Sequence, residues 1–232
     1  MNETSDTVID STVRWSSILA RGPEAESFLQ GQLSQDVSTV STTGAWALLL
    51  APDGIVITSC LVSAAPDGYD LAVPRELGDV ALARLRRFLL RTQCTLELAE
   101  RVDGPINTVS EQIHAGLPGA AEFARGLTPQ CFGAGFVAST VSFTKGCFTG
   151  QELVGRLDAR GSSVPWRMIR ATGPNEARIG DVLASKGPAG VSGLTSLTHD
   201  GESVVGLGFA HRSLFGSAEL ELAVDVCVEE LV

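Results

Sequence analysis

The sequence has no C-x-x-C pair, no basic excess, and no apolar run near the roughly 20 residues that cross a bilayer. The first absence argues against a zinc finger or an iron–sulfur cluster held within the chain. The formal net charge of -10 argues against direct nucleic-acid binding, which needs a basic face. The N-terminus is polar and acidic with no apolar stretch, so we expect neither a secretory signal nor a membrane protein.

Cysteine is present but in an odd number, at positions 60, 94, 131, 147 and 227. This usage is typical of a reduced cytoplasmic protein in which most thiols are buried and inert. Hydrophobic residues make up 44% of the 232 residues and charged residues 19%, which indicates a folded, soluble chain. Its length allows one large domain or two ordinary ones.

The first hundred residues alternate between strand and helix patterns. A strand is predicted over 13–19, and a helix opens at Gly22-Pro23 and closes at Gly31. A hairpin is predicted for 46–50 and 55–62, around the turn Pro52-Asp53-Gly54. Further strands follow at 69–73 and 94–98. The predicted class is α+β with a mostly antiparallel sheet.

Between the last two of these strands, residues 76–90 follow a helical period. The apolar face that this period predicts comprises Leu77, Val80, Ala81, Leu85 and Phe88. Arginines gather toward the C-terminal end of the helix, where the helix dipole favours positive charge. They form a local basic cluster in an acidic chain.

Residues 101–140 are weakly patterned and predict short helices at most. After Gly161, short apolar or alternating runs are separated by glycine-rich turn signals, which predicts a small β-barrel or sandwich. The runs cover residues 166–171, 182–184, 191–197, 204–209 and 220–228. We therefore expect an α+β region over residues 1–162 and a C-terminal β-barrel domain over 163–232.

The densest run of chemically capable residues extends from Lys145 to Glu152, with the sequence K-G-C-F-T-G-Q-E. Thr149 and Glu152 fit a capping box that would start a helix. Cys147 would then lie near the positive end of the helix dipole and near Lys145, and both features favour the thiolate. The sequence therefore predicts a reactive cysteine, with a small buried residue in a tight turn as the alternative.

The neighbours of Cys147 differ in how well structure alone explains them. Lys145 is either a contact for an anion or a solvated charge. Arg156 follows Glu152 by four residues, which predicts an ion pair on one helix face. Gln151 has no evident structural role, and its amide can donate and accept as recognition of a heterocycle requires.

The run 145–152, followed by Arg156, closely resembles the signature K-G-C-[Y/F]-x-G-Q-E of the YgfZ-like folate-binding proteins. That family belongs to the wider superfamily of the glycine-cleavage aminomethyltransferases. Residues 28–37, F-L-Q-G-Q-L-S-Q-D-V, resemble its N-terminal block, and Pro52-Asp53-Gly54 resembles its hairpin turn. The resemblance covers nearly the whole chain.

The resemblance implies ferredoxin-like α+β units around a central folate cavity, followed by a β-barrel. It implies tetrahydrofolate as cofactor and a role in the assembly or repair of iron–sulfur enzymes, including enzymes of tRNA modification. Cys147 would be the redox-capable group and Lys145 would tune it. The residues that would line or brace the cavity are Gln30, Gln32, Asp36, Gln151, Glu152 and Arg156. Gln30, Gln32 and Asp36 can equally be loop caps.

One departure from the superfamily bears on activity. The aminomethyltransferases carry a catalytic aspartate shortly after the hairpin turn, whereas this chain has Thr58-Ser59-Cys60 there, with no acid. That difference counts against the alternative function, a folate-dependent aminomethyl or one-carbon transferase. A third interpretation is an interaction module that docks a partner without catalysis.

Overall fold

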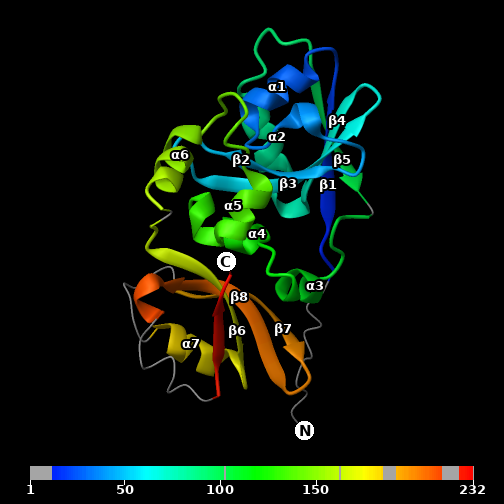
Figure 1. Cartoon of the computed structure of the whole chain (residues 1–232). Helices are drawn as coiled ribbons and strands as arrows, with labels where there is room; N and C mark the ends of the chain where they lie inside the picture. The colour runs from blue at the N-terminus through cyan, green and yellow to red at the C-terminus, as the bar shows by residue number, and fades with distance from the viewer. Residues whose placement is uncertain (1–11, 102, 162, 185–191, 216–224, 232) are drawn as a thin grey trace.

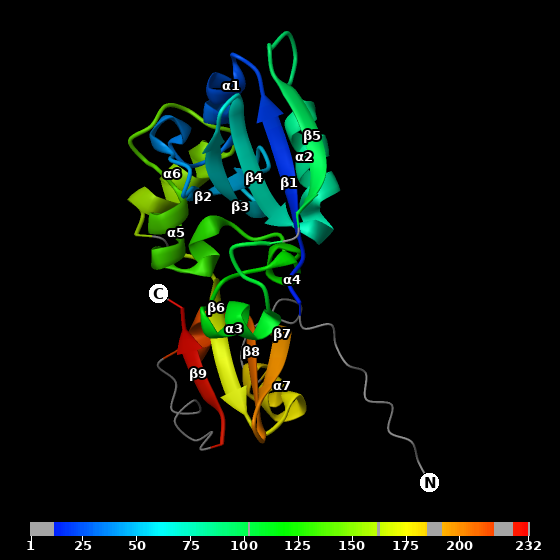
Figure 2. The same cartoon turned by 90° about the vertical axis from the view of Figure 1, so that its right-hand side faces the viewer.

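The computed structural model describes residues 12–101, 103–161, 163–184, 192–215 and 225–231. Two antiparallel sheets occupy opposite ends of the molecule, and short helices fill the space between them (Figures 1 and 2). The α+β class is confirmed. No helix in the described ranges is long and apolar enough to cross a membrane.

The first sheet has the strand order β2-β3-β4-β1-β5, and every neighbouring pair is antiparallel. Its strands are β1 (Trp15–Arg21), β2 (Ala45–Leu50), β3 (Val56–Ala65), β4 (Gly68–Pro74) and β5 (Thr95–Arg101). The predicted hairpin is confirmed, because β2 and β3 pair across a turn closed by a hydrogen bond from Ala51 N to Ile55 O.

Two helices, α1 (Ala25–Gln32) and α2 (Gly78–Arg86), cover one face of this sheet. α2 buries Ala81, Leu82 and Leu85 against the sheet, as their helical spacing predicts. It begins two residues later than expected, because a 3-10 turn, η2 (Arg75–Leu77), precedes it. Val80 and Phe88, predicted on the buried face, are exposed instead.

The middle of the chain supplies the layer between the two sheets. Its elements are α3 (Val109–His114), α4 (Ala120–Phe123), η3 (Pro129–Phe132), α5 (Ala134–Thr140) and α6 (Gln151–Ala159). The 3-10 turn η1 (Val37–Thr39) instead packs with α1 in the core of the first sheet. A second core joins Leu48 and Leu50 of the first sheet, Phe132 of this layer, and Leu207 and Phe209 of the second sheet. The prediction of short helices over 101–140 is confirmed.

The second sheet has the order β7-β8-β6-β9, again antiparallel throughout. Its strands are β6 (Trp166–Gly173), β7 (Gly193–Asp200), β8 (Ser203–His211) and β9 (Cys227–Glu230), with η4 (Arg212–Leu214) after β8. The predicted closed barrel is not found among the described residues, because β7 and β9 are the two edges of an open sheet. The domain boundary at 162 stays a prediction, and residue 162 itself lies outside the described ranges.

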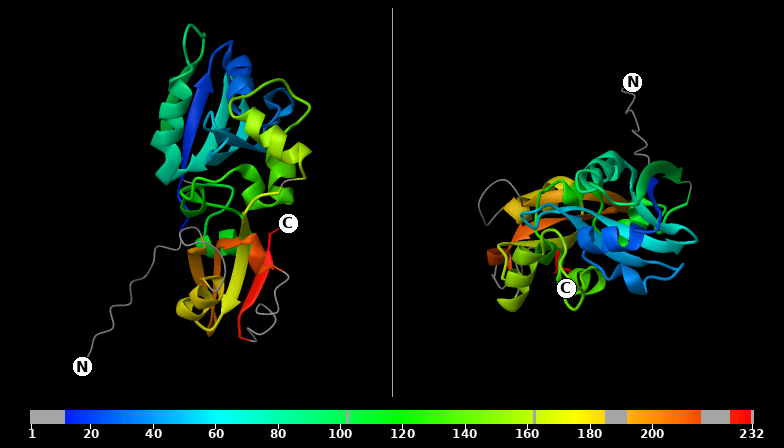
Figure 3. Two further views of the ribbon diagram at one scale, coloured as in Figure 1. Left: turned by 90° about the vertical axis from the view of Figure 1, so that its left-hand side faces the viewer. Right: turned by 90° about the horizontal axis from the view of Figure 1, so that it is seen from above.

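A helix, α7 (Glu176–Ala184), packs with the second sheet (Figure 3). The strand predicted over 182–184 is therefore wrong. Ile179, Val182 and Leu183 are buried, and their spacing of three and four residues is a helical one. The run predicted over 220–228 lies partly outside the described residues, and β9 covers its end.

Candidate functional site

The helix that follows the K-G-C-F-T-G-Q-E run starts without the predicted capping box. α6 begins at Gln151, and its N-cap is Gly150 in the left-handed region at φ 84°, with no side-chain cap. Thr149 donates its backbone N–H to Gly31 O at 3.1 Å, and Gln151 Oε1 accepts from Phe148 N at 3.3 Å. The predicted Thr149–Glu152 capping box is therefore absent. The bond from Thr149 to Gly31 and the turn between Phe148 and Gln151 are found at the start of α6 instead.

Gly150 is where the run meets the β2–β3 hairpin. A Cβ atom on Gly150 would lie 2.7 Å from Ala51 O and 2.9 Å from Leu50 Cβ, so no larger residue fits without movement. Phe148 is buried in the same core as Leu50. The run is therefore seated on the hairpin turn that the sequence resemblance also singled out.

Lys145 is buried, and its ammonium group donates to three backbone carbonyls. Nζ lies 2.7 Å from Gln30 O, 2.7 Å from Leu33 O and 2.9 Å from Gln35 O. These three bonds use all the hydrogens of the ammonium group. Burial lowers the pKa of Lys145 to about 8, against the attraction of Asp36, which raises it. Lys145 thus holds the chain that leaves α1.

The same loop is closed from inside by its own side chains. Gln30 Nε2 donates to Asp36 Oδ1 at 2.9 Å, and Gln30 Oε1 accepts from Val37 N at 2.8 Å. Asp36 also caps η1 by accepting from Ser38 N, and hydrogen bonds from the Ser38 hydroxyl and Gln30 lower the pKa of its carboxyl. Gln32 Oε1 accepts from Arg84 at 3.3 Å. Gln30 and Asp36 therefore lie in one loop, and Lys145 anchors that loop through its hydrogen bonds to the backbone.

Cys147 is exposed, as is the neighbouring Gly146. Cys60, Cys94 and Cys131 are buried, which confirms that most of the thiols are buried, and burial raises the pKa of Cys60 to about 12. The predicted ion pair of Glu152 and Arg156 is also confirmed, at 2.6 Å on the surface of α6. Among the described residues, no group of three ligating side chains could hold a metal ion.

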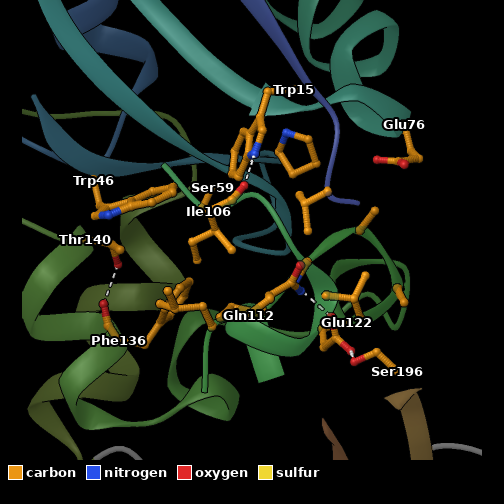
Figure 4. Close-up of a pocket in the computed structure, with 18 of the residues that line it drawn as sticks. Trp15, Trp46, Ser59, Glu76, Ile106, Gln112, Glu122, Phe136, Thr140 and Ser196 are labelled. Atoms are coloured by element: carbon orange, nitrogen blue, oxygen red, sulfur yellow. Dashed lines mark hydrogen bonds between the residues drawn. The ribbon is translucent and has the colours of Figure 1, made fainter. Parts of the chain in front are cut away.

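A cavity of about 430 Å³ lies between the first sheet and helices α3 to α5 (Figure 4). Trp15 and Trp46 form its wall on the side of the sheet, with ring centroids 6.2 Å apart and planes at 54°. Trp15 Nε1 donates to Ile106 O at 2.7 Å, which fixes the indole. Ser59 on β3 faces the same space. The cavity therefore offers aromatic surface with hydroxyl groups among it.

The opposite side of the cavity carries a buried carboxylate, Glu122 on α4, beside the amide of Gln112 (Figure 4). Glu122 Oε2 accepts from Gly119 N at 2.8 Å. Oε1 accepts from the hydroxyls of Thr195 at 2.5 Å and Ser196 at 2.8 Å. Both hydroxyls belong to β7, where the pairing with β8 is irregular. The second sheet thus reaches the cavity through Glu122.

None of the eight residues singled out in the sequence lines this cavity. The K-G-C run is connected to the cavity only indirectly, through hydrogen bonds of Ser34. Its hydroxyl donates to Thr140 O at 2.6 Å, and Thr140 lines the cavity. Its carbonyl accepts from Ser142 N at 2.9 Å, just before the K-G-C run. The loop that Lys145 anchors is therefore bonded to the cavity wall without facing the cavity.

Few sequence patterns point to the residues that line the cavity. Trp46 has the pattern of a core residue, and Ser59 is distinguished in the sequence only by lying where the superfamily carries an acid. The other lining residues come from separate segments of the chain, such as Ile106, Gln112 and Glu122. No spacing in the sequence connects them.

The fold is shared with an aminomethyltransferase. One similar solved structure is glycine cleavage system aminomethyltransferase T from Bartonella henselae, with a TM-score of 0.52 and 12% sequence identity. The match covers 87% of this chain and 76% of that one. No family model and no curated protein matches the chain. At this identity the likeness shows that the two chains share a fold.

Proposed function

We propose that this chain is a cytoplasmic YgfZ-like protein that binds tetrahydrofolate and assists the assembly or repair of iron–sulfur clusters in client enzymes. The observation that carries the proposal is the cavity with two tryptophans on one side and a buried carboxylate on the other. It lies in a fold shared with an aminomethyltransferase. The K-G-C-F-T-G-Q-E resemblance names the folate and the iron–sulfur role.

The residues of the cavity suit a reduced folate. A pterin is flat and apolar on its faces, and it carries several N–H donors on its edge. Indole rings favour stacked or edge contacts with such a ring. Glu122 is fully buried, and its three hydrogen bonds fix the wall of the cavity on the side opposite the tryptophans. A volume of about 430 Å³ is in the range of small-molecule sites.

The K-G-C run would have two roles: residues bonded to it support the wall of the cavity, and its exposed cysteine contacts a partner protein. Cys147 is exposed and available to a client, either by thiol–disulfide exchange or by contact with a cluster. We propose that Lys145, Gln30, Gln32 and Asp36 brace the cavity wall rather than line it. Gln151, Glu152 and Arg156 would set the helix that presents Cys147.

The transferase alternative has less support. The hydroxyl of Ser59 faces the cavity near where the superfamily would carry an aspartate, and a hydroxyl cannot take the place of that charge. Turnover of an aminomethyl donor by the pure protein with tetrahydrofolate would favour this alternative over the present proposal.

Folate binding is tested by calorimetry with tetrahydrofolate under anaerobic conditions. We expect Trp46→Ala to weaken binding about tenfold or more, because the ligand loses one aromatic wall. Phe143→Ala, which removes an exposed aromatic ring outside the cavity, is the control and should bind as the wild type does. No binding to the wild-type protein, or equal binding by Trp46→Ala, would contradict the proposal.

The role of the thiol is tested in cells that lack the protein. We expect Cys147→Ala to fail to restore the activity of iron–sulfur enzymes, whereas Cys227→Ala restores it. Both cysteines are exposed, so the pair separates the K-G-C run from thiol chemistry in general. Full restoration by Cys147→Ala would remove Cys147 from the mechanism and leave folate binding untouched.

A further inference from the structure

The outer side of α2 carries an unusual row of side chains. Val80, Arg84 and Phe88 are spaced by four residues, so they follow one another along the helix surface. Val80 is 53% exposed, Phe88 42% and the following Leu90 78%. Within the described ranges, the only other exposed large hydrophobic residue is Phe143. Exposed apolar surface is therefore concentrated at α2.

Within this row Arg84 is only 7% exposed, and only one of its three guanidinium nitrogens has a hydrogen-bond partner. Nη1 donates to Gln32 Oε1 at 3.3 Å, and the Phe88 ring lies 4.2 Å from Cζ, over the flat face of the guanidinium. Nε and Nη2 are buried and have no partner. A buried donor without a partner destabilises the folded state by about 1–3 kcal/mol.

The two atoms without partners form one edge of the guanidinium group. That edge holds two parallel N–H donors, the arrangement that takes a carboxylate or a phosphate with two hydrogen bonds. Arg87 and Arg91 follow, both exposed, so positive charge continues past the end of α2. Burial and the nearby charge of Arg87 lower the pKa of Arg84.

The α2 surface is separate from the cavity. α2 packs on the core that contains Ile18, Ala20 and Cys60. Ser59, the neighbour of Cys60 on β3, faces the cavity. Because successive residues of a strand point to opposite faces, α2 and the cavity lie on opposite faces of the first sheet. A ligand at α2 is therefore distinct from the proposed folate.

We propose that the α2 surface, comprising Val80, Arg84, Arg87, Phe88 and Leu90, binds an acidic segment of a partner protein. A carboxylate of the partner takes the Nε and Nη2 edge of Arg84 after a local rearrangement, because both atoms are buried in the free protein. Apolar side chains beside the carboxylate cover the three exposed hydrophobic residues. A free phosphate would satisfy Arg84 but leave that apolar surface in water. A protein segment that combines acidic and apolar side chains matches both features.

The test uses fluorescence anisotropy with a short labelled peptide of glutamate, leucine and phenylalanine, and its counterpart with glutamine in place of glutamate. We expect the acidic peptide to bind the wild-type protein, and Arg84→Met to weaken binding about tenfold or more. Replacing glutamate by glutamine in the peptide should weaken binding to the wild-type protein. The loss should be about as large as the loss that Arg84→Met causes for the acidic peptide. Phe88→Ser should weaken both peptides.

Arg86→Gln is the matched control. It removes the same charge from the same helix, but Arg86 points elsewhere and donates to Leu96 O. We expect its affinity for the acidic peptide to stay within about twofold of wild type, since a distant surface charge contributes little. Arg84→Met should melt no lower than the wild type, because it removes unpaired buried donors.

Three results would overturn the proposal. The first is no binding of the acidic peptide by the wild-type protein. The second is unchanged peptide affinity in Arg84→Met together with a lower melting temperature, which would make Arg84 a structural residue. The third is binding of inorganic phosphate to the wild type without binding of the peptide, which would make the α2 surface a small-anion site. None of these depends on whether folate binds.

Discussion

At the scale of single residues, Lys145 has an environment with two opposing effects. Its ammonium group is buried, which disfavours the charge, yet it donates to three carbonyls, which favours it. The pKa of about 8 means that burial has the larger effect. In the unfolded chain the side chain returns to its ordinary pKa of 10.5.

This difference predicts a dependence of stability on pH. Between about pH 8 and 10.5 the unfolded chain binds more protons at Lys145 than the folded protein does, so the free energy of unfolding rises with pH in that window. Urea unfolding of the wild type and of Lys145→Met, compared at several pH values, measures the effect. The advantage of the wild type over Lys145→Met should grow from pH 8 to 10. A flat difference would mean that burial and the carbonyls cancel, and a falling difference would mean that the carbonyls outweigh burial.

At the scale of elements, the start of α6 provides a second prediction. Gly150→Ala places a Cβ 2.7 Å from Ala51 O and forces a positive φ on alanine, so we expect a loss of roughly 1–3 kcal/mol or more. Gly155→Ala, inside α6 with open space around its Cα, should stabilise by up to about 1 kcal/mol. Thermal melting of the two variants measures both, and equal effects would contradict the role of Gly150.

The elements that sequence patterns predicted well are those fixed by local chemistry. The Pro52-Asp53-Gly54 turn and the apolar strands beside it define the β2–β3 hairpin without help from the rest of the chain. The capping box failed because Thr149 is engaged by Gly31, more than a hundred residues earlier in the sequence. The end of α7 was mistaken for a strand because three residues are too few to reveal a helical period.

The candidate site also has a part that the sequence predicts and a part that it does not. The K-G-C run is contiguous, so its exposed cysteine and its ion pair could be found from the sequence. Both interpretations of Lys145, an anion contact and a solvated charge, are wrong, because Lys145 is buried and donates to carbonyls more than a hundred residues away in the sequence. The cavity could not, because its walls are assembled by the pairing of strands and the packing of α3 to α5. Its tryptophans look like ordinary core residues until the structure shows the space between them and Glu122.

At the scale of the whole molecule, Glu122 joins the two sheets. It lies on α4, lines the cavity and accepts hydrogen bonds from Thr195 and Ser196 on β7. The double change Thr195→Val and Ser196→Ala leaves Glu122 Oε1 buried without a donor. We expect it to destabilise the protein by about 1–3 kcal/mol, since a buried acceptor is left without a donor.

Urea unfolding and tetrahydrofolate binding should be measured together on this double variant. A single change at Thr198 on the same strand, Thr198→Val, is the control, because Thr198 makes no contact with Glu122. If the second sheet supports the cavity, both stability and folate affinity fall in the double variant. Full stability in that variant would show that β7 and α4 do not depend on each other.

The three carbonyls held by Lys145 also bear on the order of folding during synthesis. All five strands of the first sheet are complete once residue 101 has left the ribosome, yet the Lys145 contacts span 110 to 115 residues. Long-range contacts form slowly, because the intervening chain must be ordered first. The loop after α1 must therefore wait for its anchor, and a nascent chain that ends before Lys145 should have a formed sheet and an open loop that a protease could cut.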